Sequence, residues 1–578
     1  MSDVLMLSSV YHIVKIAEPL GIGALAAVAR EAGFSVEVVE PAAEGWTPAR
    51  AAEEVLRRPS KVLGVSLLRD EQKSDVYEMV ECLRSAGDDR FIVLGGHAPT
   101  IAISTGEEDA PPPMEGWRVP LPGASRLPWG PSDDWASEAI ARRRIVSYRD
   151  LGRIVDAFMI GEADLSFPLL LDAVVSGKAW REVPGVAYVG EDGEFVFGPA
   201  APKPENLDEL PLMSRDVLQI HAQRFPDKLA ASINLGRGCY YRCTFCTVAV
   251  FQKVQVGSAH RQRSPESVVR EIRSLNDRFG VTEFNFEDDN FIIRNKRGFE
   301  KIRALCDAIL TLPFEITFSI FCRADVVERE LFSDLRDAGM NIVFLGLESV
   351  HEADLEFFHK GMKLATIFNA LDVLRDLGFG LEVNEGRRVK LGFIAWHPLT
   401  TYASLHDALD FVEEYQLPPK LLRRRLALYS GIPIKHQIRE LGLLDPESMK
   451  GWHFRDPNLE YLENAVESYI NLTVGKPYRD RIRTVCKALR KYAHTEAPDD
   501  LVELQCEMDR MSLRFVRELL DMAERIPSAD IPAAVGDLLS ERRDDFFAWI
   551  RDQDIDRRLD EGFVLAGVPA DAPDIFRQ

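Results

Sequence analysis

The chain has 578 residues with a formal net charge of −22, and 46% of its residues are hydrophobic. That length predicts roughly three or four globular domains, and the acidic balance argues against nucleic acid as a substrate because phosphate backbones would be repelled. No apolar run reaches the about 18 residues of a membrane span and no basic segment precedes the first apolar run, so we expect a cytoplasmic protein with neither a membrane anchor nor a secretory signal.

Residues 1–100 alternate short apolar runs with helical segments. Strands are expected at residues 4–10, 35–40, 61–68 and 90–96, and helices at 21–33, 47–58 and 74–87. This alternation predicts a doubly wound, Rossmann-like parallel sheet, whose ligands bind beyond the carboxyl ends of the strands. Arg69 follows the third strand there. Gly95, Gly96 and His97 follow the fourth strand, where a glycine pair lets a large flat ligand approach the backbone.

Residues 101 to about 152 interrupt this pattern. The segment is rich in proline and glycine and holds three tryptophans, so we expect a surface excursion instead of a helix or strand. The sheet resumes at residues 154–167 and a helix follows to about Ser176. The Glu-Asp-Gly turn within residues 183–200 predicts a β-hairpin.

Three of the eight cysteines, Cys239, Cys243 and Cys246, lie in a C-x3-C-x2-C loop that a Gly-Arg-Gly sequence opens. Thiolates so close in sequence can all face one point. A structural zinc site usually has four protein ligands and a 4Fe–4S cluster usually has four thiolates, but no fourth cysteine lies nearby. The spacing favours a cluster with three irons held by cysteine and one left open. A zinc loop and three unrelated buried thiols are the alternatives, and a cluster would fit a reducing cytoplasm.

From Leu229 onward, about six strand-helix units predict a partial parallel barrel with its chemistry at the carboxyl ends of the strands. Glu287, Arg323 and Glu348 stand at successive strand ends. Carboxylates can hold an ammonium group and arginine a carboxylate, so this set could bind a zwitterionic ligand. Each of the three could instead form a structural ion pair.

Trp396 and His397 end a later strand of this region. Trp396 could stack on a flat substrate or fill the core, and His397 is the candidate to take or give a proton near neutral pH. Residues 450–578 are mainly helical, with apolar residues at three- and four-residue steps. They predict a packed helical bundle that closes the barrel mouth.

The cysteine loop, with Phe245 before the last cysteine, resembles the cluster loop of the radical S-adenosylmethionine (SAM) superfamily. The resemblance implies a 4Fe–4S cluster on the three cysteines. It also implies that Arg323 grips the carboxylate of SAM, and that Glu287 and Glu348 face its ribose or amine.

Other pieces resemble the cobalamin-binding domain that precedes the cluster domain in one branch of this superfamily; they are residues 18–33, 94–100 and 154–171. The D-x-H-x-x-G motif with which corrinoid proteins ligate cobalt is absent, and His12 lacks an orienting acid. Arg69 is therefore the group expected under the corrin, with the glycine pair and histidine after the fourth strand beside it. A cation there would disfavour lower coordination of cobalt. The alternative is an Arg69–Asp70 ion pair.

We expect a cobalamin-binding domain at residues 1–205, a partial radical SAM barrel at 206–445 and a helical domain at 446–578. This order is similar to that of the tryptophan 2-C-methyltransferases of thiostrepton-type thiopeptide antibiotic biosynthesis. The similarity implies a cobalamin- and SAM-dependent methyltransferase that methylates carbon 2 of L-tryptophan by polar transfer from methylcobalamin. It also implies an external electron donor. On that route the open iron could be held by a carboxylate, from Glu271 or Glu287.

Three other functions stay open. The first is radical methylation of an unactivated carbon or a phosphinate in natural-product biosynthesis. The second is a cobalamin-dependent radical SAM cyclase, and the third is a corrinoid and cluster protein that only carries electrons or binds a partner. The acidity and the lack of a basic appendage argue against modification of tRNA.

Overall fold

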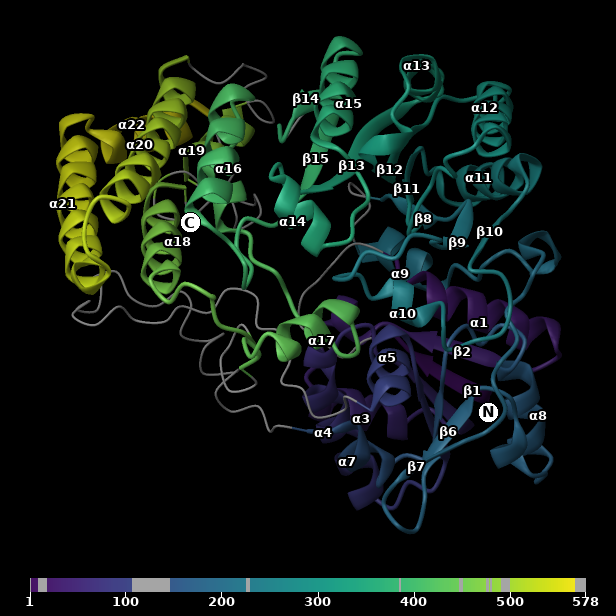
Figure 1. The fold of residues 1–578 in the computed structure, drawn as a ribbon. Coiled ribbons are helices and arrows are strands. Elements are labelled where there is room, and N and C mark those ends of the chain that lie inside the picture. Colours follow the sequence, from purple (N-terminus) through teal and green to yellow (C-terminus); the bar gives the residue numbers. More distant parts are fainter. Residues whose placement is uncertain are drawn as a thin grey trace.

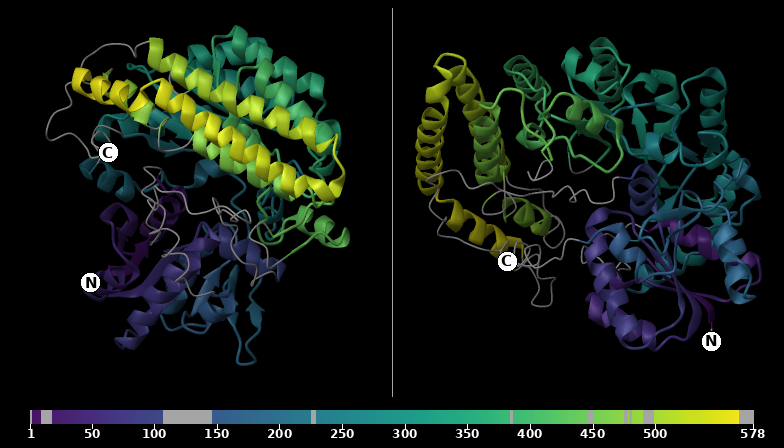
Figure 2. Two further views of the ribbon diagram at one scale, coloured as in Figure 1. Left: turned by 90° about the vertical axis from the view of Figure 1, so that its left-hand side faces the viewer. Right: turned by 60° about the horizontal axis from the view of Figure 1, so that its bottom comes forward.

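The computed structural model describes residues 2–8, 18–106, 146–224, 229–383, 386–445, 451–474, 478, 481–489 and 499–566. Figure 1 shows an N-terminal α/β domain, a second α/β domain above it, and a group of C-terminal helices at the side of the second domain. Figure 2 shows that the long C-terminal helices run side by side. This is the fold class that the sequence predicts.

The N-terminal sheet has the strand order β2-β1-β3-β4-β5-β6-β7. The first five strands pair in parallel, which confirms the doubly wound sheet, and the last two form the predicted hairpin as an antiparallel edge of the same sheet. The order 2-1-3-4-5 is flavodoxin-like, with its ligand site where the strand order reverses. The strands are β1 (Ser2–Leu7), β2 (Val36–Val39), β3 (Ser60–Ser66), β4 (Phe91–Gly95), β5 (Ala157–Met159), β6 (Val186–Val189) and β7 (Phe195–Phe197).

The helices of this domain cover both faces of the sheet. They are α1 (Leu20–Glu31), α2 (Pro41–Glu44), α3 (Pro48–Leu56), α4 (Lys73–Ser85), α5 (His97–Thr105), α7 (Tyr148–Gly152) and α8 (Phe167–Val175). Because α5 runs through Thr105 and α7 begins at Tyr148, the excursion is shorter than the sequence pattern indicates. Residues 107–145 and His12 lie outside the described residues.

The second domain contains a parallel sheet in the order β14-β15-β13-β12-β11-β8 and a separate β9–β10 pair. The hydrophobic pattern missed β14, which has two residues, and it missed β9, whose sequence is Gly-Arg-Gly. The strands are β8 (Ala231–Ile233), β9 (Gly236–Gly238), β10 (His260–Gln262), β11 (Glu283–Phe286), β12 (Thr317–Arg323), β13 (Met340–Glu348), β14 (Gly380–Leu381) and β15 (Arg388–Phe393).

Helix α11 illustrates how the local sequence sets the helices of this domain. Ser264 accepts a hydrogen bond from the backbone of Ser267, Pro265 occupies the first turn, and Gly280 ends the helix in the left-handed conformation. The helices are α9 (Asp216–Arg224), α10 (Val248–Phe251), α11 (Pro265–Phe279), α12 (Lys296–Leu310), α13 (Arg329–Asp337), α14 (Glu352–Phe357), α15 (Leu364–Asp376), α16 (Tyr402–Glu414) and α17 (Pro433–Glu440).

The C-terminal helices extend the core of the second domain. Leu462, Phe515 and Leu539 belong to the same buried cluster as Phe318 of β12, so burial of apolar surface attaches these helices to the sheet domain. The helices are α18 (Leu459–Val474), α19 (Arg481–Ala488), α20 (Asp499–Ala523), α21 (Ile531–Asp552) and α22 (Ile555–Ala566). Within the described ranges, no helix has both the length and the apolar character that crossing a bilayer requires.

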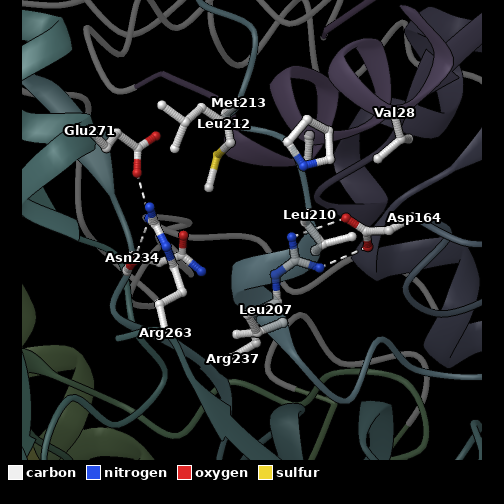
Figure 3. Close-up of a pocket in the computed structure, with 12 residues that line it drawn as sticks. Val28, Asp164, Leu207, Leu210, Leu212, Met213, Asn234, Arg237, Arg263 and Glu271 are labelled. Atoms are coloured by element: carbon white, nitrogen blue, oxygen red, sulfur yellow. Dashed lines mark hydrogen bonds and ion pairs between the residues drawn. The ribbon is translucent and has the colours of Figure 1, made fainter. Parts of the chain in front are cut away.

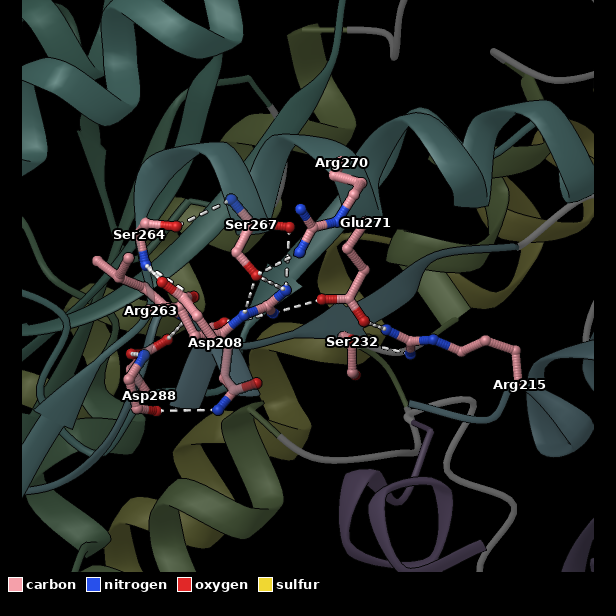
Figure 4. Close-up of polar contacts among 12 residues, drawn as sticks. Asp208, Arg215, Ser232, Arg263, Ser264, Ser267, Arg270, Glu271 and Asp288 are labelled. Atoms are coloured by element: carbon pink, nitrogen blue, oxygen red, sulfur yellow. Dashed lines mark hydrogen bonds and ion pairs between the residues drawn. The ribbon is translucent and has the colours of Figure 1, made fainter. Parts of the chain in front are cut away.

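A chain of buried charges joins the N-terminal domain to the second domain (Figure 4). Arg215, in the connector, donates to Glu18 at 2.5 Å and to Glu271 of α11 at 2.7 Å, and Arg263 donates to the other oxygen of Glu271. Burial alone would raise the pKa of Glu271, but the two arginines hold it below its usual value. Glu271 is therefore occupied as a structural partner, which disfavours it as a ligand of the open iron.

Candidate functional site

A cavity of about 670 Å³ lies between the two α/β domains. The carboxyl ends of β1, β3, β4 and β5 line one side of it, and the loop that leads into the cysteine motif lines the other side. The volume is typical of ligand and cofactor sites. The cavity brings together five of the sequence-predicted site residues, which are Arg69, Gly95, Gly96, His97 and Glu287.

The approach to the cysteine loop is fixed by backbone pairing. Strand β9 pairs antiparallel with β10, so that Arg237 lies opposite Arg261. The Asp288 carboxylate accepts the backbone N–H groups of Leu235 and Gly236, and the Asp289 carboxylate accepts that of Gly238 at 3.1 Å. Gly238 has φ +86°, and an added Cβ would collide with a carbonyl oxygen of the loop before β10, so glycine is required there.

The three motif cysteines lie within eight consecutive residues. Cys243 is buried, and Cys239 and Cys246 are half-buried. Three thiolates suit a 4Fe–4S cluster that keeps one iron open, because such a cluster otherwise takes four thiolates. Burial raises the pKa of Cys246 to about 11, so assembly of a cluster on this thiol would release a proton.

The glycine that follows β4 is required by the packing of the N-terminal domain, and it lines the cavity. Gly96 has φ +112°, and an added Cβ would collide with the carbonyl oxygen of Leu67. Gly96 is the N-cap residue of α5, and His97 is the first residue of that helix. The His97 ring shares a hydrogen bond of 2.8 Å with the hydroxyl of Thr247 and stacks on Phe251. Burial lowers the pKa of His97 to about 4, so its ring is neutral. His97 thus links the N-terminal domain to α10, next to the cysteine motif.

Arg69 is exposed at the cavity wall and forms no ion pair within the described part of the chain. Asp70 instead accepts the hydroxyl of Tyr148 at 2.7 Å and lies 3.9 Å from the ammonium of Lys73. The Arg69–Asp70 ion pair considered from the sequence is therefore wrong. A cation that faces the cavity is available to a ligand bound there.

Arg323 and Glu348 lie at neighbouring strand ends, outside the lining of this cavity. Arg323 is buried; it donates twice to Asp325 at 3.0 Å and once to the carbonyl of Lys360 at 2.7 Å, and its guanidinium lies over the ring of Tyr241. One of its nitrogens is 3.7 Å from the sulfur of Cys243. Arg323 therefore contacts the cysteine loop, and its N–H groups are already bonded to Asp325 and Lys360.

Glu348 adopts φ +72°, rare for a residue with a side chain, at a register shift between β13 and β15. Its carboxylate accepts the ammonium of Lys360 at 2.8 Å. Gly346 and Gly392, aligned on adjacent strands, leave the space that this carboxylate fills. The strained backbone and the two glycines together hold a carboxylate at the carboxyl end of the sheet.

Trp396 and His397 are core residues. Trp396 is fully buried, donates to the carbonyl of Leu422 at 2.6 Å and packs edge-on against Phe454, so it fills the core and does not stack on a substrate. His397 is 0% exposed and lies 3.1 Å from Asp354 under Phe357. The side chain of His397 does not line the cavity between the domains.

The sequence patterns missed an ion-pair network that crosses the domain boundary. Arg237 donates to Asp164 at 2.7 and 3.0 Å and to Glu162 at 3.1 Å, and Glu162 also accepts Arg261 at 2.5 Å. Figure 3 shows the guanidinium of Arg237 directed at the carboxylate of Asp164. Both residues line a small cavity of about 20 Å³, which is room for one water molecule. Only the arginine between two glycines could have pointed to this network.

Two family models match the chain. One, described as the radical SAM superfamily, matches residues 233–386, and the other, a B12 binding domain, matches residues 10–109. The cysteine loop falls in the first and the glycine pair after β4 falls in the second.

Curated relatives match part of the chain. An uncharacterized methyltransferase of Pyrococcus horikoshii is 22% identical over 62% of this chain and 67% of its own length. The hopanoid C-3 methylase of Methylococcus capsulatus is 31% identical over 40% of this chain and 42% of its own length. The anaerobic magnesium-protoporphyrin IX monomethyl ester cyclase of Rubrivivax gelatinosus is 25% identical over 58% of this chain and 60% of its own length. The chain thus spans about two fifths to two thirds of these relatives.

Two solved structures share the fold. The cobalamin-dependent SAM radical enzyme OxsB, with aqua-cobalamin and SAM bound, superposes with a TM-score of 0.73 at 17% identity and covers 100% of this chain and 83% of its own. The radical SAM methyltransferase TsrM of Kitasatospora setae, with tryptophan and a SAM analogue bound, gives a TM-score of 0.55 at 16% identity and covers 76% of each chain. At these identities the likeness concerns the fold.

Proposed function

We propose that this chain, which matches the models of the radical SAM superfamily and of a B12 binding domain, is an enzyme that transfers a methyl group from SAM, through cobalamin, to a carbon atom of a small molecule. Its cofactors are a 4Fe–4S cluster, SAM and cobalamin. The observation that carries the proposal is the shared cavity of about 670 Å³, which the ends of the N-terminal strands and the approach to the cysteine loop both line. When bound, cobalamin supplies a cobalt centre that can accept and release a methyl group.

Cys239, Cys243 and Cys246 are the proposed cluster ligands, and the chain on either side of them, at Gly238 and at Val248, lines the cavity. Gly95 and Gly96 line it at the end of β4, where we place the corrin. Glu287, which accepts the hydroxyl of Ser232 at 3.4 Å, carries a carboxylate into the cavity between them. We assign to it the amine or ribose of SAM.

Two assignments concern the neighbouring strand ends. Glu348, over its glycine pair, is the second proposed contact of the ribose or amine of SAM. For Arg323 we revise the role, because a ligand carboxylate would have to displace Asp325 from a buried pair. We propose that it orients Cys243 instead.

For the substrate we propose L-tryptophan, methylated at carbon 2 by polar transfer. Support comes from the environment of the cobalt face: among the described residues lining the cavity, His97 is the only imidazole, and it is engaged with Thr247. Arg69 is a cation and a very poor metal ligand. A cobalamin held beside these residues would supply a methyl group of cationic character, which suits an electron-rich indole carbon.

The test is an incubation of the reconstituted enzyme with methyl-labelled SAM, a reductant and L-tryptophan. The proposal expects labelled 2-methyltryptophan and no stoichiometric 5′-deoxyadenosine. Deoxyadenosine in step with a methylated product would replace the polar route by radical methylation. Label that never leaves SAM, with a cyclised product from another substrate, would replace methyl transfer altogether.

A further inference from the structure

A row of charged side chains runs along the contact between α16 of the sheet domain and α20 of the C-terminal helices. The two helices are neighbours in the fold (Figure 1). On α16, His406, Asp410 and Glu413 follow one another at steps of four and three residues and therefore share one face. On the α20 side, Arg517, Asp521 and Glu524 have the same spacing, with Glu524 in the turn just after the helix.

At one end of this row, two carboxylates meet one permanent cation. Arg517 donates to Asp410 at 2.7 Å and to Glu413 at 2.5 Å. Arginine is always charged, so this end of the row is neutralised by the protein itself.

At the other end, two carboxylates meet an imidazole. One ligand atom from each of His406, Asp521 and Glu524 lies within 4.8 Å of the others, and Nε2 of His406 is 3.1 Å from a carboxylate oxygen of Glu524. The nearest arginine, Arg525, is 77% exposed and only approaches Asp521 to 3.8 Å, and such a pair contributes little.

We propose that His406, Asp521 and Glu524 bind a divalent first-row transition metal ion of the Zn²⁺ type. One imidazole and two carboxylates are a donor set that such ions take. Neighbouring donors on an ion with bonds of about 2.1 Å are roughly 3.0–3.4 Å apart, and the observed separation of His406 and Glu524 is 3.1 Å. Three protein ligands leave further positions for water.

The ion would do at this end of the row what Arg517 does at the other. It would neutralise two carboxylates and link α16, through His406, to the end of α20, through Asp521 and Glu524. His406 and Glu524 are 118 positions apart in the sequence. The site is separate from the cysteine loop, and it would stabilise the attachment of the C-terminal helices.

The experiment uses the full chain with its cluster and cobalamin in place, so that the motif cysteines are not free to bind zinc. After brief chelation, ZnCl₂ is added while thermal unfolding is followed and bound zinc is counted. We expect one zinc per chain and a rise in Tm. His406→Ala and, separately, Glu524→Gln should weaken binding by at least about 100-fold. Asp410→Asn, on the same helix at the Arg517 end, should bind zinc like the parent enzyme.

Two results would overturn the proposal. The first is zinc binding of equal strength in the parent enzyme, His406→Ala and Glu524→Gln, which would mean that the ion binds elsewhere. The second is a parent enzyme that takes up no zinc and whose Tm is unchanged by it. His406 and Glu524 would then form an ion pair only.

Discussion

Arg237 and Asp164 are joined by two hydrogen bonds, of 2.7 and 3.0 Å, across the boundary between the two α/β domains. Arg237 lies in β9, two residues before Cys239, and Asp164 lies just beyond β5 at the cavity wall. The two groups are 73 residues apart in the sequence. Their pairing joins the N-terminal wall of the cavity to the strand that leads into the cysteine motif.

Replacing this arginine is expected to uncouple the two sites without unfolding either domain. Arg237→Gln keeps a polar side chain but leaves the buried Asp164 without its charged partner, which costs about 3–5 kcal/mol. We expect methyl transfer to fall at least about 100-fold while iron and cobalamin remain bound. Turnover and metal content of the same preparation are the measurements.

Arg30→Gln is the matched control for this variant. Arg30 also forms a two-pronged pair with an aspartate across segments, with Asp216, but it does so at the surface. Surface pairs contribute about 0–1 kcal/mol, so activity should stay near that of the parent. Equal losses in both variants would mean that Arg237 has no special position.

The glycine after β4 gives a test of the corrin site. Gly96→Ala adds a Cβ at φ +112° that would collide with the carbonyl oxygen of Leu67, and the backbone must shift where a corrin would lie. We expect the purified variant to lose most of its corrinoid absorption. Gly33→Ala is the control: it has φ +92° with nothing within 4 Å of an added Cβ, so it carries the strain without the collision and should keep its corrinoid.

The sequence predicted the ends of the parallel strands well, because topology alone brings those ends to one edge of a sheet. That is why Arg69 and Gly96 lie at one edge of the N-terminal sheet, whereas Glu287, which follows β11 of the other sheet, joins them in the cavity only because the two domains dock. Trp396 and His397 show what the pattern could not decide. Both follow a strand, but the direction of each side chain depends on its contacts with Leu422 and Asp354 from other elements.

The domain-crossing pair of Arg237 and Asp164 was hidden for a related reason. It exists only after the two domains dock, and neither residue lies in a periodic pattern. The cysteine motif was found because three cysteines lie within eight consecutive residues.

The stability of the protein should depend on pH through Glu40. Burial, and then the charge of Glu18, raise the pKa of this carboxyl to about 7 from 4.5, against a hydrogen bond from Ser8 that lowers it. A raised pKa means that the folded state holds the proton more tightly. The contribution of Glu40 is therefore complete below about pH 4.5 and is lost as the pH rises to about 7.

Glu40→Gln is expected to flatten this dependence, because glutamine cannot ionise. Between pH 5 and 7 the Tm of the parent should fall more steeply than that of the variant, by an amount that corresponds to about 1–3 kcal/mol. Glu37→Gln, at a position that is 47% exposed, is the control and should follow the parent. Parallel curves for all three proteins would remove Glu40 as the cause.

The cluster ligands are tested by iron content. Cys239→Ala, Cys243→Ala and Cys246→Ala should each reduce the iron of the reconstituted protein well below the about four atoms of one cluster. Cys82→Ala changes an exposed thiol outside the loop and should leave the iron unchanged. Full iron in any of the three loop variants would exclude that cysteine as a ligand.

The central claim is that the cluster and the corrin face the same cavity. The most direct measurement is the electron spin relaxation of cob(II)alamin in the holoenzyme, with the cluster either oxidised or reduced, because a paramagnetic cluster nearby shortens that relaxation. The account predicts a clear acceleration when the cluster is reduced, and none in Cys243→Ala. Identical relaxation in both states of the parent enzyme, with iron and cobalamin both bound, would contradict it.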